Sequence, residues 1–256
     1  MDNEKETQLI RNRFRELAQK CHERNIYTYT SFLGQMEQDL FHRMEKELSF
    51  VSWEMWGGME DATRIIIRFG SEHDLGYEEP YPIVCLLISA KNDKFADALS
   101  HRDFLGALMN VGIERTTLGD IVVGEKEAYL FCLETVADFI TEQLRKVRHT
   151  DVACTRTTVT DNLPKSEPVE EFYAVASERS DAIISKIYHL SRSDVQKLYT
   201  QGRVLCNGRI LESSSKMLKN FDQVTVRGFG KFIYCGISRE TKKGKISVCV
   251  KRYLAK

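Results

Sequence analysis

The sequence predicts an α+β protein with a mainly helical N-terminal unit, a βαββαβ middle domain and a C-terminal domain built from a helix and a β-hairpin. Three patterns support this prediction. Apolar residues recur at helical spacing near the N-terminus, and strand-like and helix-like runs alternate between residues 83 and 156. Near residue 200, an Asn-Gly turn follows a capped amphipathic helix.

Length and composition are those of a soluble chain with more than one domain. Of the 256 residues, 42% are hydrophobic and 29% are charged, so two or three domains can each bury a core. Pro164 and Pro168 lie in a polar stretch that predicts a linker. We expect an N-terminal unit at 1–76, a middle domain at 77–157, a linker at 158–171 and a C-terminal domain at 172–256.

Two apolar stripes predict helices in the N-terminal unit. The first begins at Leu9, and the second runs over residues 32–44. A strand pair is expected next, at residues 53–56 and 64–69. The sequence leaves open whether this pair joins the sheet of the middle domain.

The middle domain alternates strands with helices. Its order, βαββαβ, is the ferredoxin-like arrangement that RRM-type RNA-binding domains also use. In the second helix, Val136, Phe139, Ile140 and Leu144 share one face. The expected elements are a strand at 83–90, a helix at 101–109, strands at 120–123 and 128–133, a helix at 134–147 and a strand at 152–156.

The tripeptide His101-Arg102-Asp103 is similar to two catalytic motifs. The protein-kinase loop needs an Asn five positions after the Asp, where Leu108 stands, and no glycine-rich loop accompanies it. The H-R-L-D motif of pseudouridine synthases needs a Leu that is missing here. We expect His101 and Asp103 to cap a helix, and we predict a protein that is not an enzyme and has no cofactor.

The most informative run lies at residues 191–208. Ser191 is placed to cap a helix, and Val195, Leu198 and Tyr199 share one face of it. After this helix, Gly202 suits the left-handed position just past a helix end.

A tight turn follows the glycine. Asn207-Gly208 stands between the strand-like runs 204–206 and 209–211, which is a strong hairpin signal. The run S-R, helix, G-x-V, N-G resembles the S-four (αL-type) domain, a small RNA-binding module. Where the S-four pattern has R-L-D and, before its last strand, G-D, this chain has Arg179-Ser180-Asp181 and Phe221-Asp222.

Charge is unevenly distributed along the chain. The 37 Lys and Arg balance the 37 Asp and Glu overall, but residues 170–256 hold 17 basic and 8 acidic residues. The C-terminal part therefore carries a net charge of +9 and the rest carries −9. This asymmetry favours a nucleic-acid partner for the C-terminal part.

The seven cysteines do not form a metal-binding pattern. They are scattered singly, and several, such as Cys85, Cys132 and Cys154, lie in apolar strand-like runs. We expect reduced packing residues in the cytoplasm and no metal site. No apolar run approaches the length that spans a bilayer, so no membrane partner is expected.

Two further C-terminal runs bear on RNA binding. Residues 227–234 are similar to the RNP octamer of RRM domains, but Lys231 replaces an aromatic residue and the position after a hairpin does not fit. We expect Gly228 and Gly230 to let the chain bend after the strand 224–226. A basic turn at 239–245 precedes a strand at 246–253 and is a secondary candidate for RNA contact.

Several stretches together resemble the YlmH-type family of bacterial RNA-binding proteins. They are residues 101–108, 112–115, 118–121 and 226–232. The resemblance implies an RRM-like middle domain, a C-terminal S-four domain and a cytoplasmic protein that associates with the large ribosomal subunit. It further implies a connection with stalled peptidyl-tRNA complexes and ribosome-associated quality control.

The sequence therefore predicts binding to structured RNA, and the family resemblance implies that this RNA is rRNA, together with tRNA, on the large ribosomal subunit. Alternatives are an RNA-modifying enzyme of the pseudouridine synthase or methyltransferase class and an adaptor linked to cell division. The oligomeric state is left open. The candidate RNA-binding residues are Arg192, Lys197, Arg203, Asn207, Arg209, Lys216, Arg227 and Lys231.

Overall fold

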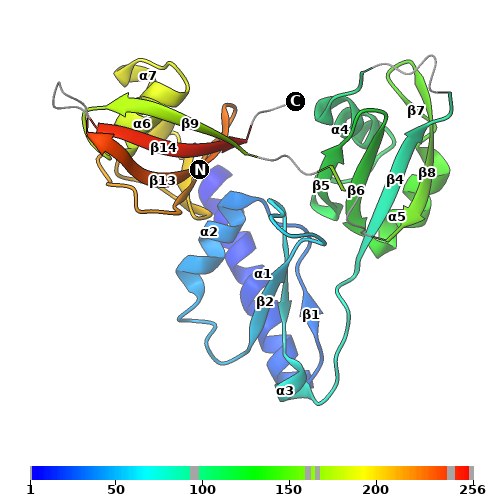
Figure 1. Cartoon of the computed structure of the whole chain (residues 1–256). Helices are drawn as coiled ribbons and strands as arrows, with labels where there is room; N and C mark the ends of the chain where they lie inside the picture. The colour runs from blue at the N-terminus through cyan, green and yellow to red at the C-terminus, as the bar shows by residue number, and fades with distance from the viewer. Residues whose placement is uncertain (1, 93–97, 159–162, 165–167, 241–245, 254–256) are drawn as a thin grey trace. The chain divides into compact units, whose positions relative to one another are not determined.

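The protein consists of two compact units, Met1–Pro164 and Lys165–Lys256. Figure 1 shows a computed structural model, which describes residues 2–92, 98–158, 163–164, 168–240 and 246–253. Both units combine helices with antiparallel sheets, so the predicted α+β class is confirmed. Within the described ranges, no helix has the length and apolar character needed to cross a membrane.

The first unit begins with a small layer of helices on a three-stranded sheet. The expected strand pair is present as β2 and β3, and β1 pairs with the other edge of β3. The sheet order is β1-β3-β2, separate from the next sheet. The elements are α1 (Asp2–Arg24), β1 (Thr28–Tyr29), α2 (Gln35–Met44), β2 (Trp53–Trp56), β3 (Ile66–Phe69) and α3 (Glu72–Leu75).

The buried stripe of α1 starts one turn later than the sequence suggests. Phe14 and Leu17 are buried, and the Phe14 ring meets the Phe41 ring of α2 edge-on at 5.3 Å. Leu9, where we expect the stripe to begin, is 69% exposed. The reason is geometric, because α2 and the sheet cover only the C-terminal part of this long helix.

The second sheet of the unit has the order β5-β6-β4-β8-β7, with all neighbours antiparallel. Across the sheet, the four strands β5-β6-β4-β8 are in the order that the predicted βαββαβ arrangement requires. Helices α4 and α5 share one core with this sheet. The elements are β4 (Ile83–Ala90), α4 (His101–Asn110), the 3-10 helix η2 (Arg115–Thr117), β5 (Leu118–Val123), β6 (Glu127–Leu133), α5 (Glu134–Gln143), β7 (Lys146–Val147) and β8 (Thr150–Thr157).

Helix α5 is shorter than predicted, and its buried face differs. It ends at Gln143, and Lys146–Val147 instead form a strand that pairs with β8 through a tight turn at Arg148, whose φ is +53°. The core side of α5 includes Ala137 and Ile140, whereas Phe139 is 46% exposed. The four-residue face expected from spacing is therefore wrong at Phe139.

The other face of the middle sheet is covered by the N-terminal layer. Tyr129 and Phe131 of β6 point away from α4 and α5 and are buried against Phe32 and Ile66. Strand β6 is thus buried on both faces. Because of this packing, the expected N-terminal unit at 1–76 and the expected middle domain at 77–157 lie in one compact unit.

Polar contacts reinforce this packing. The Arg64 guanidinium donates to the carbonyl oxygens of Phe32 (2.9 Å), Leu118 (2.8 Å) and Arg115 (3.1 Å). The carboxylate of Asp120 on β5 accepts a hydrogen bond from the Arg64 backbone N–H at 3.2 Å. Burial lowers the pKa of Arg64, which stays charged far above neutral pH.

The expected linker at 158–171 is shorter in the structure. Its last three residues belong to strand β9 (Val169–Val175), which pairs along β14. At the other end, Leu163 packs against the core around Phe131. The expected linker is longer because its bounds come from local composition, which does not reveal the pairing of β9 with the distant strand β14.

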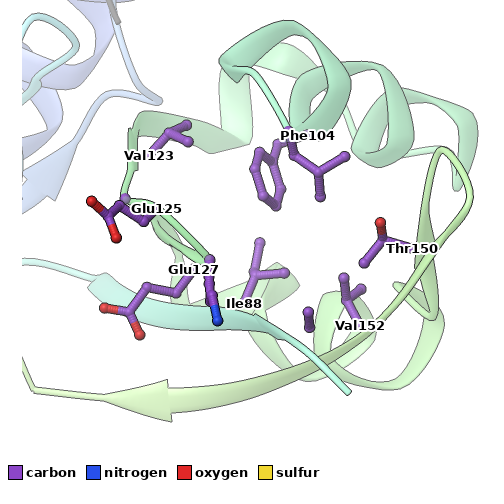
Figure 2. Close-up of a pocket in the computed structure, with 11 residues that line it drawn as sticks. Ile88, Phe104, Val123, Glu125, Glu127, Thr150 and Val152 are labelled. Atoms are coloured by element: carbon purple, nitrogen blue, oxygen red, sulfur yellow. The ribbon is translucent and has the colours of Figure 1, made fainter. Parts of the chain in front are cut away.

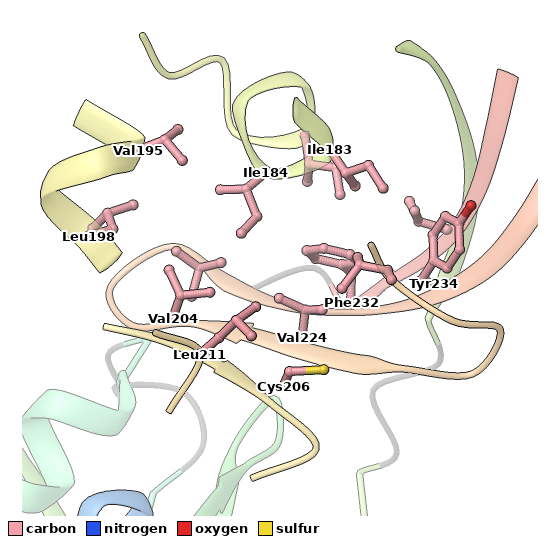
Figure 3. Close-up of a cluster of buried hydrophobic side chains, with 14 of the residues drawn as sticks. Ile183, Ile184, Val195, Leu198, Val204, Cys206, Leu211, Val224, Phe232 and Tyr234 are labelled. Carbon is pink, nitrogen blue, oxygen red and sulfur yellow. The ribbon is translucent and has the colours of Figure 1, made fainter. Parts of the chain in front are cut away.

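The second unit is a six-stranded antiparallel sheet with two helices on one face. The sheet order is β11-β10-β12-β13-β14-β9. Figure 3 shows side chains of α6 and α7 facing the sheet, including Ile184 and Leu198. The elements are β9 (Val169–Val175), α6 (Ser180–Ile187), α7 (Arg192–Thr200), β10 (Val204–Cys206), β11 (Arg209–Ile210), β12 (Gln223–Val226), β13 (Gly230–Glu240) and β14 (Ile246–Tyr253).

The cysteines behave as packing residues. All seven are free thiols, and five of them are buried. Burial raises the pKa of Cys85 and Cys154 to about 11 and that of Cys132 to about 12. These three thiols are therefore protonated at neutral pH, as expected for packing residues.

Candidate nucleic-acid interface

Helix α7 separates an apolar face from a basic one. Ser191 caps it, accepting a hydrogen bond from the Asp194 N–H at 3.2 Å, as the sequence predicts. Val195 and Leu198 are buried, whereas Arg192 and Lys197 are exposed. Because Lys197 pairs with Asp194 at 3.0 Å, Arg192 is the stronger cationic group on this face.

The predicted turns around the first hairpin are confirmed. Gly202 lies just past α7 with φ +62°, and Asn207 and Gly208 have φ +52° and +77° between β10 and β11. Positive φ at both central residues is the geometry of a type I′ turn, which matches the twist of paired strands. The hairpin places Arg209 directly opposite Cys206, with the Arg209 side chain exposed.

Arg203 and Arg227 are joined by two hydrogen bonds to each other's backbone. The Arg203 Nη2 donates to the Arg227 carbonyl oxygen at 2.6 Å, and the Arg203 carbonyl oxygen accepts from the Arg227 N–H at 2.9 Å. Burial, followed by the charge of Arg203, lowers the pKa of Arg227. In the described ranges neither guanidinium has a carboxylate partner. A bound anion such as a phosphate would offset the repulsion between the positive charges of Arg203 and Arg227.

Aromatic rings flank this pair. The Arg203 guanidinium lies 6.0 Å from the centre of the Phe229 ring, and Phe229 meets Tyr188 at 5.6 Å. Phe229 is 40% exposed. The positive charge of Arg203 therefore lies beside the accessible ring of Phe229.

Asn207 and Lys216 belong to a second group, around Asp222. The Asn207 Nδ2 donates to the Asp222 Oδ1 at 2.8 Å, and its Oδ1 accepts from the Gln223 N–H at 2.8 Å. Lys216 is exposed, and its Nζ lies 3.8 Å from the Cys206 Sγ. Asn207 thus holds the hairpin to β12, and RNA contact by its side chain stays a prediction.

Lys231 lies on another face of the unit. In β13 it alternates with Phe232, which is in the core under the helices. Its Nζ lies 4.8 Å from the centre of the Tyr253 ring, and Thr225 is its partner on β12. The eight candidate residues are therefore spread over five places: α7, the Arg203–Arg227 pair, the Asp222 group, strand β11 with Arg209, and the sheet face of Lys231.

The octamer-like run 227–234 forms the turn between β12 and β13 and the start of β13. Gly228 has φ +85° and Gly230 has φ +140°, as expected for glycines that bend the chain. A Cβ at Gly228 would lie 2.5 Å from the Arg203 Nη2, so this glycine also admits the guanidinium. Most of the basic turn at 239–245 lies outside the described residues, which end at Glu240 and resume at Ile246.

The catalytic-like tripeptide of the first unit has a structural role. The Asp103 carboxylate accepts from the Ser100 N–H at 2.8 Å and from its hydroxyl at 2.7 Å. These bonds lower the pKa of Asp103 and close a capping box at the start of α4. Ser100 is the N-cap, and His101 is the first residue of the helix.

A hollow near the same helix has an apolar lining. Figure 2 shows Phe104 above Ile88 and Val152, with Glu125 and Glu127 at its edge. The first three belong to the core under α4 and α5. Glu127 also accepts a hydrogen bond from the Tyr129 hydroxyl at 2.9 Å. This arrangement does not gather the convergent polar groups of a catalytic pocket.

Comparison with known proteins places the chain in a family. A family model described as "Putative RNA-binding domain in YlmH" matches residues 78–161. The curated "Ribosome-associated protein quality control protein P2" of Bacillus subtilis is 32% identical over 169 residues, 64% of this chain and 66% of that protein. The chain belongs to the YlmH-type family. It spans just under two thirds of the length of this curated relative.

A solved structure supports the fold of this YlmH-type chain. "Cell division protein ylmH from Streptococcus pneumoniae" is 18% identical, with a TM-score of 0.50 over 62% of this chain and 94% of that one. At this identity the likeness concerns the fold alone.

Within this YlmH-type chain, the matched region 78–161 is the middle sheet with α4 and α5. RRM domains read bases with aromatic side chains on the sheet face opposite their helices. Here the corresponding aromatics, Tyr129 and Phe131, are only 7% and 0% exposed because Phe32 and Ile66 cover them. Base stacking on this face is therefore blocked in the structure.

Two aromatic residues of the second unit are not marked as site residues by any local sequence pattern. Phe221 enters only as a departure from the S-four pattern, yet it is 79% exposed. Its positive φ was detectable in principle, because the pattern has glycine at that position. Tyr188 packs beside Phe229, a neighbourhood that no local sequence signal reveals.

Proposed function

We propose that this protein binds structured RNA through its C-terminal unit, as a cytoplasmic protein without catalytic activity. The observation that carries the proposal is the charge of this unit. Residues 165–256 hold 18 basic and 9 acidic residues, and the unit exposes basic side chains on α7 and the β10–β11 hairpin. The Arg203–Arg227 pair adds a site suited to a phosphate.

The helix–hairpin arrangement supports an S-four mode of binding. Cationic side chains fixed on a capped helix and a tight hairpin match a backbone shape more than a base sequence. The RNA we propose is rRNA of the large ribosomal subunit, with tRNA as a further ligand. The name of the Bacillus subtilis relative supports ribosome-associated quality control, and the role we propose is in quality control of stalled translation.

The first unit is proposed to position the protein on its RNA site. Its residues 1–164 hold 19 basic and 28 acidic residues, so it repels a phosphate backbone overall. Its exposed cations include Arg145, Lys146 and Arg148 around the β7–β8 turn. The RRM-like character of the middle domain is proposed as a fold relationship, with its sheet face closed by the N-terminal layer.

Fragments that divide the chain at Pro164 test which unit supplies affinity. The fragment 165–256 should bind large-subunit rRNA alone, with a log–log salt slope of about 0.7–0.9 per phosphate contact. The fragment 1–164 should bind weakly at every salt concentration because of its charge. Filter-binding titrations over a salt series measure both. Dominant affinity in the acidic fragment would make the middle domain the principal RNA reader.

A pair of matched double variants tests the binding face in the full chain. Arg192→Ala with Lys197→Ala removes two exposed cations of α7 and should lower the salt slope by about 2. Its Tm should stay close to that of the wild type, because both side chains point away from the core.

The control is Arg145→Ala with Lys146→Ala, which removes the same charge from exposed positions of the first unit. Lys146 also pairs with an aspartate, Asp151 at 3.7 Å, as Lys197 does with Asp194. This control should keep the wild-type slope. Equal losses in both double variants would show that net charge, and not the α7 face, governs binding.

A further inference from the structure

Phe221 combines high exposure with a strained backbone. Its side chain is 79% exposed, the highest value among the large hydrophobic residues in the described ranges. Its φ is +70°, a region that bulky L residues seldom adopt because the Cβ approaches the following carbonyl. The ring gains little from burial, and the backbone would be more favourable with glycine.

The turn that carries Phe221 is held firmly from both sides. The Phe221 N–H donates to the Tyr234 carbonyl oxygen at 2.7 Å, and the Tyr234 N–H donates to the Asp222 carbonyl oxygen at 2.9 Å. The Asp222 carboxylate accepts from the Lys219 N–H at 2.9 Å and from Asn207 at 2.8 Å. The ring is therefore displayed at a fixed place, where binding orders only two side-chain torsions.

The surroundings of the ring are basic. Lys219 is two residues before Phe221, and the charge of Lys216 helps to keep the pKa of the adjacent Asp222 low. Asp222, the adjacent carboxylate, is only 8% exposed and is engaged by hydrogen bonds. An aromatic ring among exposed cations is complementary to RNA, in which unpaired bases lie beside phosphates.

We propose that Phe221 is a stacking platform for an unpaired base of the bound RNA. This inference rests on the proposed function and specifies it further: the protein would read a loop or bulge next to the backbone that its cations hold. Strained residues persist where the surrounding structure fixes them, and they cluster at ligand sites. Stacking of one base contributes about fivefold to 150-fold in affinity.

Three variants of the full chain test the proposal, with large-subunit rRNA as the probe over a salt series. Phe221→Gly removes the ring and relieves the backbone, so its Tm should equal or exceed that of the wild type. Its affinity should fall at least about fivefold at every salt concentration, with an unchanged slope, because stacking releases no counterions. Phe221→Tyr keeps the ring and should bind like the wild type.

Phe221→Leu separates stacking from a general apolar contact. Leucine keeps apolar bulk without a π-face, so this variant should lose as much affinity as Phe221→Gly. Wild-type affinity in Phe221→Leu would show that apolar bulk without a π-face suffices at this position and would overturn the proposal. Wild-type affinity in Phe221→Gly would also overturn it. Failure of the wild type to bind rRNA would instead reject the proposed function itself.

Discussion

Replacing Phe131 with alanine is expected to lower the free energy of unfolding of the first unit by about 3–5 kcal/mol. The Phe131 ring is fully buried between the middle sheet and the N-terminal layer. Gly58 approaches the ring so closely that a Cβ at this glycine would lie 2.5 Å from the Phe131 Cδ1. Such tight surroundings collapse poorly, so the substitution leaves a cavity.

Phe139→Ala is the matched control. It makes the same chemical change in the same unit, but the Phe139 side chain is 46% exposed. We expect this variant to lose less than about 1 kcal/mol. Urea unfolding of residues 1–164, followed by tryptophan fluorescence of Trp53 and Trp56, measures both. Similar losses in the two variants would contradict the burial of β6 on both faces.

Phe131→Ala also has a functional consequence. Loss of the ring weakens the contact through which Phe32 and Ile66 cover the aromatic face of the middle sheet. If that cover limits RNA contact by the middle domain, the variant should bind RNA more tightly than the wild-type fragment 1–164. Unchanged weak binding would show that the acidic charge of this unit alone limits its affinity.

Replacing Asp222 with alanine is expected to destabilise the second unit by about 2–3 kcal/mol. The buried carboxylate joins the β10–β11 hairpin to the turn before β12, through Asn207 and the Lys219 N–H. Its removal leaves these donors without their acceptor. Asp194→Ala, which removes an exposed carboxylate at the start of α7, is the control and should lose about 1 kcal/mol or less.

The same residue predicts a pH dependence. Burial raises the pKa of Asp222, but the hydrogen bonds from the Lys219 N–H and Asn207 outweigh it, so the pKa lies below its usual range. The stabilisation is therefore fully present above the unfolded-state pKa of about 3.9 and is lost as the pH falls through the lower folded-state pKa. The difference between wild type and Asp222→Ala should shrink below about pH 4 in thermal melts. A difference independent of pH would contradict this account.

Much of the second unit was predictable because its signals are local. A capping serine, a glycine after the helix and an Asn-Gly turn each act within a few residues. The bounds of β10 and β14 agree with the sequence-based prediction, as do the positive φ values of Gly202, Asn207 and Gly208. Strand β9 was missed because its partner β14 lies more than seventy residues away.

The sequence by itself determined the α+β class, the βαββαβ order and the basic character of the C-terminal part, because periodicity and charge are properties of the chain. Only the tertiary structure decided which surfaces are available. It placed Phe131 under the N-terminal layer, brought Arg203 to Arg227 and left Phe221 exposed on a strained turn. Exposure and proximity depend on contacts between residues far apart in sequence, which local patterns do not encode.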